Sequence, residues 1–149
     1  MTTAAARRAD LAGRLAIAAS SDAGRKRSHN EDRVGSDPQH GIVVLADGMG
    51  GHKGGEVASA LAVETILNDL SEGLDADPGE DDEYGFSPES ALARGVIRKA
   101  NTVILDTASS QPQYEGMGTT VVVALFYDDQ VTLAHVGDSR VYRLREDHL

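Results

Sequence analysis

The sequence predicts an α+β fold, in which helices and antiparallel strands form separate layers. Two helical patterns lie next to each other in the chain, the apolar strand patterns after them are also grouped, and regular βαβ alternation is missing. Such grouping favours an α+β layered fold over a doubly wound parallel sheet. With 149 residues, of which 40% are hydrophobic, the chain has the length of one domain and can bury a core.

The first two strand patterns differ in strength. Residues 14–20 alternate weakly and suggest a strand, after an N-terminal extension over residues 1–13. Residues 4–16 are expected to form a short helix or to fray. The polar residues 20–33 indicate a turn that leads into a short strand. Residues 42–46 are continuously apolar, rich in β-branched side chains and followed by Asp47-Gly48, which predicts a buried strand.

Two helices are predicted after a glycine-rich loop. Residues 48–55 contain five glycines, which indicates a loop whose backbone approaches another group closely. Apolar residues recur at helical spacing over residues 56–70. A second helix is expected from the start signal Ser87-Pro88-Glu89 to about residue 108, and residues 109–116 are expected to form a loop.

The C-terminal part predicts an antiparallel meander of three strands. The expected strands cover residues 119–127, 131–136 and 140–145, with tight turns between them. The first of these is apolar on both faces and should be buried between layers. His135, which is flanked by apolar residues in the second strand, is expected to be a hydrogen-bonded core residue.

The composition excludes several classes of function. The net charge of −10 argues against nucleic acid as a partner, because phosphate backbones select for Lys and Arg. Most of that charge comes from acids in residues 72–83, which predict a solvated acidic loop over about residues 71–87. The absence of cysteine excludes disulfides and thiolate chemistry and is compatible with a cytoplasmic protein. The apolar runs are far shorter than the roughly 20 residues that span a bilayer, so no membrane segment is expected in this chain.

Three polar clusters lie at the ends of predicted strands, in residues 27–32, 47–52 and 135–140. Carboxylates beside glycine-rich loops can hold a hard cation, and Mg²⁺ and Mn²⁺ prefer such oxygen ligands. Each cluster taken alone is also typical of an ordinary turn. The residue types therefore permit a carboxylate–water metal site without requiring one.

Four motifs occur in a characteristic order: RSHNED at 27–32, ADGMGGHKGGEVAS at 46–59, GTT at 118–120 and AHVGDSRVY at 134–142. Together they resemble the N-terminal part of a bacterial PPM-family (type 2C) metal-dependent protein serine/threonine phosphatase, over about residues 15–149. The resemblance implies an αββα fold, in which two antiparallel β-sheets form a sandwich flanked by helices. It implies that residues 14–149 are the N-terminal part of that domain.

The same resemblance implies a metal site of two Mn²⁺ or Mg²⁺ ions. Asp47 would bridge the two ions and Gly48 would donate its backbone carbonyl. Glu31 and Asp32 match the pair that supports the second ion, and which of them contacts it is left open. Asp138 matches a ligand of a third, weaker ion.

The implied reaction is hydrolysis of phosphoserine or phosphothreonine in proteins, including substrates that a Ser/Thr protein kinase would make. Arg27 would bind the phosphate, and His52 would act as general acid toward the leaving oxygen. A solvent molecule activated between the two ions would attack phosphorus directly, without a covalent enzyme intermediate.

The chain departs from the family pattern because two further aspartate motifs, Ser-Asp-Gly and Asp-Asn, do not occur in it. The alternative is therefore a truncated or degenerate phosphatase module that binds metal or phosphopeptide without turnover. We expect the 149-residue chain alone to be weakly folded, to take up Mn²⁺ weakly and to be close to inactive.

Overall fold

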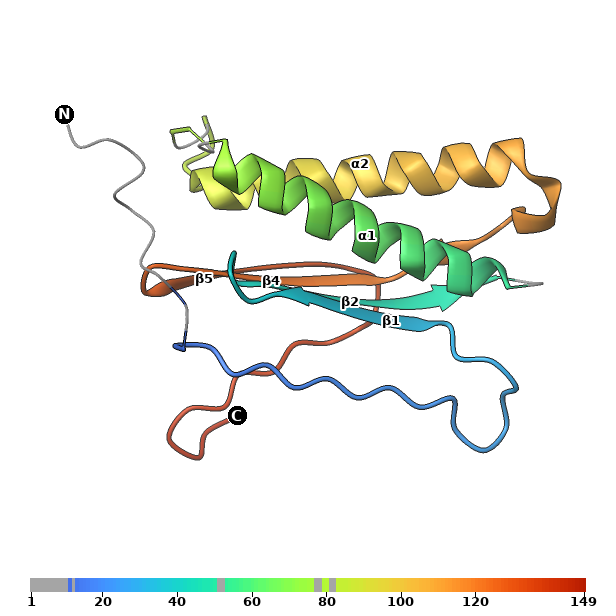
Figure 1. Ribbon diagram of the computed structural model, residues 1–149, viewed down its shortest axis with the longest axis horizontal. Helices are drawn as coiled ribbons and strands as arrows, with labels where there is room; N and C mark the ends of the chain where they lie inside the picture. Colours follow the sequence, from blue (N-terminus) through green and yellow to red (C-terminus); the bar gives the residue numbers. More distant parts are fainter. Residues whose placement is uncertain (1–10, 12, 51–52, 77–78, 81–82) are drawn as a thin grey trace.

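One antiparallel sheet is covered on one face by two helices in the computed structural model, which describes residues 11, 13–50, 53–76, 79–80 and 83–149 (Figure 1). The sheet has the order β1-β2-β4-β5, and β3 pairs with β2. The elements are β1 (Asp32–Asp37), β2 (Ile42–Met49), α1 (Gly54–Asp75), α2 (Pro88–Ser110), the 3₁₀ helix η2 (Pro112–Tyr114), β3 (Gly118–Thr119), β4 (Val121–Tyr127) and β5 (Gln130–Val136).

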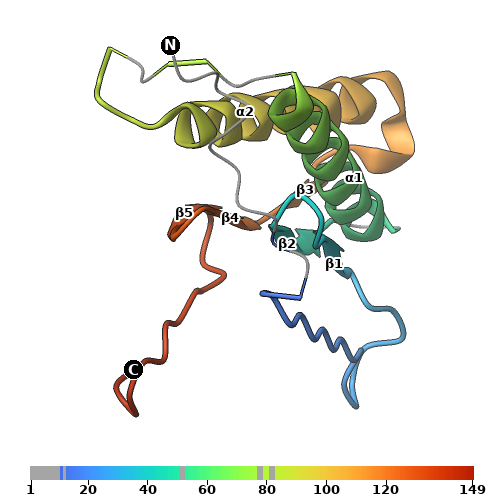
Figure 2. The ribbon, with the colours of Figure 1, turned by 60° about the vertical axis from the view of Figure 1, so that its left-hand side comes forward.

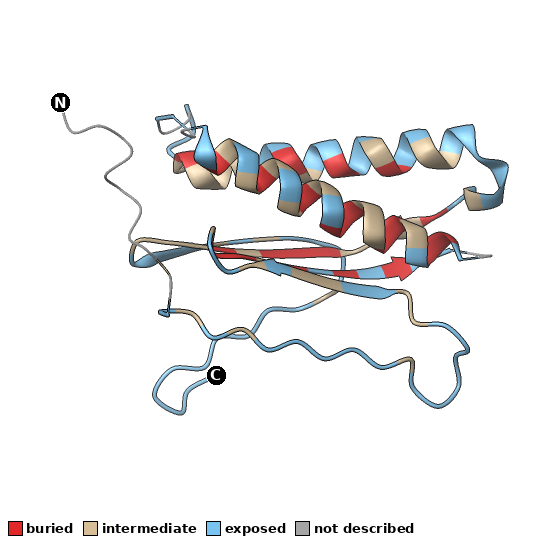
Figure 3. Ribbon diagram, viewed as in Figure 1, coloured by how far each residue is buried: buried red, intermediate tan, exposed pale blue. Residues whose placement is uncertain are grey.

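The core lies between the sheet and the helices, and alternate residues of the central strands fill it. Ile42 and Val44 of β2 and Leu125 of β4 are fully buried. Ile66 of α1 is fully buried against them, and each such side chain contributes about 1.5–3 kcal/mol to folding. Figure 3 shows this buried layer between the sheet and the helices.

Helix α1 lies close to strand β1 because β1 has a glycine at the contact. A Cβ on Gly35 would come within 2.7 Å of Leu67 Cδ1 and would also meet Val63. The missing side chain therefore allows α1 to pack directly on the edge of the sheet.

Helix α2 begins where the sequence predicts. The Ser87 hydroxyl accepts a hydrogen bond from the Ser90 N–H at 3.2 Å, and Pro88 occupies the first turn. Four hydroxyls then form a closed ring that ties this helix start to β4 and β5. The ring runs Ser87–Ser90 (3.1 Å), Ser90–Thr132 (2.8 Å), Thr132–Tyr127 (3.0 Å) and Tyr127–Ser87 (3.0 Å).

The other face of the sheet is open, and apolar side chains lie on it. Leu45, Val131 and Leu133 point away from the helices and are 39%, 44% and 51% exposed. The segments before β1 and after β5 run beneath this face (Figures 1 and 2). In the described part of the chain the expected second sheet is not present, so the structure shows one half of a sandwich.

Two predicted strands are wrong. Residues 14–20 form no strand, and residues 140–145 form none either, apart from an isolated bridge between Arg145 and His148. A strand requires a hydrogen-bonded neighbour, and neither segment pairs with one. The prediction for His135 is wrong for a related reason: it is exposed because it lies on the open face.

Smaller differences concern element ends. Helix α1 continues to Asp75, so the first part of the expected acidic loop is helical. The predicted loop at residues 109–116 contains the end of α2 and the helix η2. In the described residues, neither helix combines the length and the apolar character that crossing a membrane requires.

Candidate active site

Two carboxylates meet at the edge of the sheet where β1 begins and β2 ends. Asp32 and Asp47 are directly opposite each other in the antiparallel register of these strands. Residues paired in this way project on the same face, with Cβ atoms about 4.5–5.5 Å apart. Both side chains therefore project on the open face of the sheet.

Three charged side chains act on the pKa of the Asp47 carboxyl group. Partial desolvation raises the pKa of Asp47, and the charge and hydrogen bond of Asp32 raise it further. Arg27 acts in the opposite direction and lowers this pKa, whereas Asp138 raises it. Three residues from two other sequence motifs, 27–32 and 134–142, thus act on one carboxylate, as expected where a cation binds.

Asp32 is oriented by a neighbour to which the sequence assigned no role. The Asn30 side-chain carbonyl accepts a hydrogen bond from the Asp32 N–H at 3.0 Å, and the Asn30 amide donates to the Ser21 hydroxyl at 2.6 Å. This local turn sets the start of β1. An Asn two residues before a strand is a known turn signal, although it does not by itself indicate a site.

Gly48 lies where β2 passes the first turn of α1. Its N–H donates to the Glu31 carbonyl at 3.1 Å, and an added Cβ would overlap the Gly55 carbonyl. Glu31 lies beside the same turn, because its Oε1 would be 2.6 Å from a Cβ on Gly55. A carboxylate near a helix N-terminus is electrostatically favourable. Of the pair left open above, Asp32 therefore faces Asp47, and Glu31 faces α1.

Asp47 is also held from the side of β3 and β4. The Thr120 N–H donates to the Asp47 carbonyl at 2.9 Å, and the Asp47 N–H donates to the Thr120 hydroxyl at 3.1 Å. The motif Gly-Thr-Thr is too common to point to this contact, so sequence reasoning missed it.

The remaining predicted site residues are placed as follows. Arg27 and Asp138 are exposed. His52 lies outside the described residues. In the part of the chain that the structure describes, no group of three or more His, Asp or Glu side chains is arranged to hold a metal ion. The oxygen donors present suit Mg²⁺ or Mn²⁺ in kind, but they do not form a complete set.

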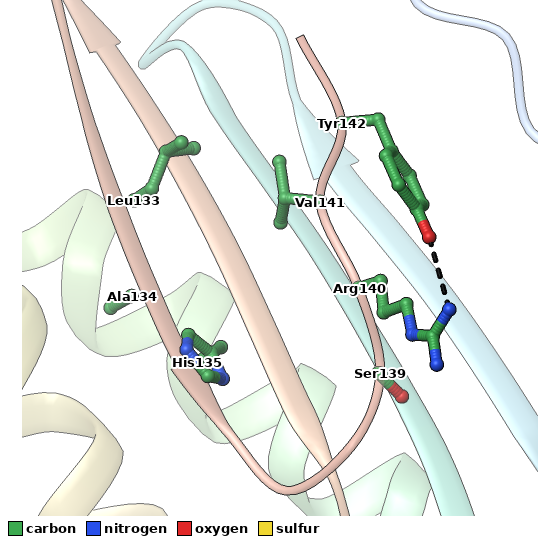
Figure 4. A pocket seen from close by; sticks show the side chains of 7 residues that line it. All are labelled: Leu133, Ala134, His135, Ser139, Arg140, Val141 and Tyr142. Carbon is green, nitrogen blue, oxygen red and sulfur yellow. Dashed lines mark hydrogen bonds between the residues drawn. The ribbon is translucent and has the colours of Figure 1, made fainter. Parts of the chain in front are cut away.

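Two hollows border the site. One, of about 320 Å³, lies between β5 and the segment after it, and Arg140 there donates to the Tyr142 hydroxyl at 3.2 Å (Figure 4). The other, of about 370 Å³, is lined by Asn30, Asp32 and Arg33, together with Ser20, Ser21 and Glu56. The second hollow is the one that includes a carboxylate of the candidate site.

The family model described as protein phosphatase 2C matches residues 22–149. The chain belongs to the protein phosphatase 2C family. It is 41% identical over 135 residues to the serine/threonine protein phosphatase PstP of Mycobacterium tuberculosis strain H37Rv, covering 91% of this chain and 24% of PstP. It is 38% identical over 138 residues to the serine/threonine phosphatase stp of Listeria monocytogenes strain EGD-e, covering 85% of this chain and 52% of that protein.

Solved structures of the family share the fold of this chain. The catalytic domain of PstP in complex with two manganese ions matches with a TM-score of 0.70 at 39% identity, over 88% of this chain and 51% of that one. The phosphatase Stp1 of Staphylococcus aureus matches with a TM-score of 0.61 at 35% identity, over 80% of this chain and 45% of that one. The resemblance and the α+β fold class are confirmed, and the chain spans between a quarter and a half of these relatives.

Proposed function

We propose that this chain is the N-terminal part of a metal-dependent phosphatase that hydrolyses phosphoserine and phosphothreonine in proteins. The observation that carries the proposal is the pairing of Asp32 with Asp47, with Arg27 and Asp138 acting on the same carboxylate. The relatives named serine/threonine phosphatase support the substrate class. Substrates made by a protein kinase and a cytoplasmic location stay predictions.

The metal-binding residues that we propose are Asp47, Gly48, Glu31 and Asp32 for two Mn²⁺ or Mg²⁺ ions and Asp138 for a third, weaker one. The PstP structure with two manganese ions supports this assignment. When bound, the ions would act as Lewis acids that activate water and neutralise charge on the phosphoryl group. Glu31 and Asp32 are consecutive, so they present carboxylates both to α1 and to Asp47.

Arg27 is the proposed phosphate-binding residue. Its guanidinium is near enough to Asp47 to lower the pKa of that carboxyl, so a phosphate held by Arg27 would lie beside the carboxylate pair. The planar guanidinium can contact two phosphate oxygens at once. His52 is the proposed general acid, because an imidazole can donate a proton to the leaving oxygen near neutral pH.

The second candidate is a module that binds metal or phosphopeptide without turnover. It is favoured by the incomplete ligand set among the described residues. The two candidates differ in whether the carboxylate pair takes part in hydrolysis once the remaining ligands of a longer protein are present.

A manganese titration followed by NMR tests the site in the chain as it exists. Paramagnetic Mn²⁺ should broaden the amide signals of Asp32 and Asp47 first. Asp47→Asn should remove that broadening, because it takes away a charged ligand, whereas Asp106→Asn on the exposed face of α2 should leave it unchanged.

Hydrolysis of a phosphothreonine peptide then distinguishes the two candidates. In a longer protein that contains this chain together with the Ser-Asp-Gly and Asp-Asn motifs, metal-dependent turnover that Asp47→Asn abolishes supports the phosphatase. Peptide binding without turnover would favour the second candidate. Equal turnover in the presence of EDTA would contradict the proposed function.

A further inference from the structure

Thr120 contacts two segments of the site that are far apart in sequence. Its backbone N–H and its hydroxyl both hydrogen-bond the backbone of Asp47, at 2.9 and 3.1 Å. The same hydroxyl lies 2.6 Å from the Ser139 hydroxyl. One side chain thus connects the end of β2 with the turn after β5.

The methyl group of Thr120 contacts the same turn. Gly137 has a φ of +96°, and a Cβ built on it would lie 2.8 Å from Thr120 Cγ2. Residue 137 therefore has to be glycine, both for its backbone conformation and for its packing on Thr120. Because Asp138 lies between Gly137 and Ser139, the turn is held on both sides of this carboxylate.

The Thr120 hydroxyl can accept one hydrogen bond and donate another, so it can link Asp47 to Ser139. The Thr120 oxygen accepts from the Asp47 N–H, and its own proton can be donated to the Ser139 oxygen. Both side chains are half-buried, so water competes only partly for these bonds. A valine at position 120 would keep the shape and lose both side-chain hydrogen bonds.

We propose that Thr120 is a positioning residue that holds the turn at residues 137–139 against the end of β2 and thereby keeps Asp138 beside Asp47. The consequence for binding rests on the proposed function. The affinity of Asp138 for a cation should depend on the Thr120 hydroxyl, although that hydroxyl is not itself a ligand. Ser139 is the partner through which the hydroxyl acts.

The first test needs no metal and uses the whole chain. Relaxation measurements by NMR should show that the backbone of residues 137–139 becomes more mobile in Thr120→Val and in Ser139→Ala. Thr120→Ser, which keeps the hydroxyl, should retain the order of the wild-type turn. Thr102→Val, on the exposed face of α2, is the matched control. An unchanged turn in both Thr120→Val and Ser139→Ala would overturn the proposal.

The second test adds Mn²⁺ and measures broadening at separate positions. In Thr120→Val, broadening at residues 137–139 should require about 2- to 10-fold more Mn²⁺, the effect expected from losing the hydrogen bond between Thr120 and Ser139 that holds this turn. The Mn²⁺ concentration needed to broaden the Asp32 signal should increase much less. Thr120→Ser should show the wild-type pattern. A general loss of structure would instead increase the required Mn²⁺ concentration equally at residues 137–139 and at Asp32. That result would overturn the positioning role of Thr120.

The two proposals fail in different ways. If Mn²⁺ broadens no signal in the wild-type chain, the metal site of the proposed function is wrong. In that case a loosened turn in Thr120→Val would still support the positioning of Asp138. If Mn²⁺ binds at Asp32 and Asp47 and the turn is unaffected by Thr120→Val, the proposed site stands and the role of Thr120 is overturned.

Discussion

At Gly48 the absence of one methyl group decides whether β2 can pass the first turn of α1. The backbone of Gly55 occupies the space that a Cβ would need, and the Glu31 carbonyl lies 2.8 Å from the same position. Asp47, the residue before it, projects to the opposite face. The glycine therefore serves the packing on one face while its neighbour carries the carboxylate on the other.

Gly48→Ala should destabilise the protein by about 1–3 kcal/mol or more, because the neighbours are backbone atoms that cannot move away easily. Thermal unfolding followed by circular dichroism measures this. Gly95→Ala is the matched control: Gly95 lies inside α2 with nothing within 4 Å of the added Cβ, so it should stabilise by about 0.5–1 kcal/mol. Equal effects of the two substitutions would contradict the packing role.

At the scale of elements, the turn between β1 and β2 is attached to the end of α1 by a histidine between two carboxylates. His40 Nδ1 lies 2.6 Å from Asp37 Oδ2, and its Nε2 lies 3.1 Å from Asp75 Oδ1. The Ser71 hydroxyl donates to Asp37 Oδ2 at 2.9 Å. Three elements are thus joined at the end of the sheet opposite to the candidate site.

The two titrating groups of this cluster shift in opposite directions. Burial acts to lower the pKa of His40, but its hydrogen bonds to Asp37 and Asp75 outweigh this and raise the pKa above 6.5. Burial acts to raise the pKa of Asp37, but hydrogen bonds from His40 and Ser71 lower it below 3.8. Protonated His40 and ionised Asp37 are therefore the forms that the fold stabilises.

The stabilisation by His40 should be complete below its unfolded pKa of 6.5 and should be lost as the pH rises through the higher folded pKa. His40→Gln should therefore reduce the free energy of unfolding more at about pH 5.5 than at about pH 9. Urea denaturation of both proteins at each pH measures the difference. A pH-independent difference between the proteins would contradict the ion pair.

The contribution of Asp37 to stability has the opposite pH dependence. It is fully present above pH 3.8, the unfolded pKa, and is lost as the pH falls through the lower folded pKa. The cluster is consequently most stabilising between these two limits. This window, from about pH 3.8 to about pH 6.5, lies in mildly acidic solution.

At the scale of the whole molecule, the open face of the sheet leaves apolar side chains in contact with solvent, which is energetically unfavourable. The apolar patch on this face consists of Leu45 on β2 and of Val131 and Leu133 on β5, with β4 between these two strands. Exposed apolar patches of this kind mark sites of association. In the sandwich that the family resemblance implies, a second sheet would cover this face. The chain spans about half of the solved relatives, which is consistent with a half-built sandwich.

Leu133→Glu should reduce self-association of the 149-residue chain, because it places a charge in the apolar patch. Sedimentation velocity over a range of concentrations measures this. Leu105→Glu is the control, since Leu105 is similarly exposed, at 55% against 51%, but lies on α2. Equal effects of both substitutions would show that the open face does not drive association.

Local patterns in the sequence were sufficient for α1, α2, β2, β4 and β5, because helical periodicity, a capping serine and apolar β-branched runs act over a few residues. The same patterns failed at residues 14–20 and 140–145, where strand formation depends on a partner that the local sequence does not encode. They failed at His135 because burial depends on a covering layer.

For the candidate site, the acidic residues were selected by the family resemblance that the four motifs carry together, because each polar cluster alone is also typical of an ordinary turn. Only the tertiary structure showed that Asp32 rather than Glu31 faces Asp47, and that Asn30 and Thr120 orient the segments carrying these carboxylates. The physical reason is distance along the chain. Thr120 and Asp47 are brought together by sheet register, which arises from packing and not from any pattern within either segment.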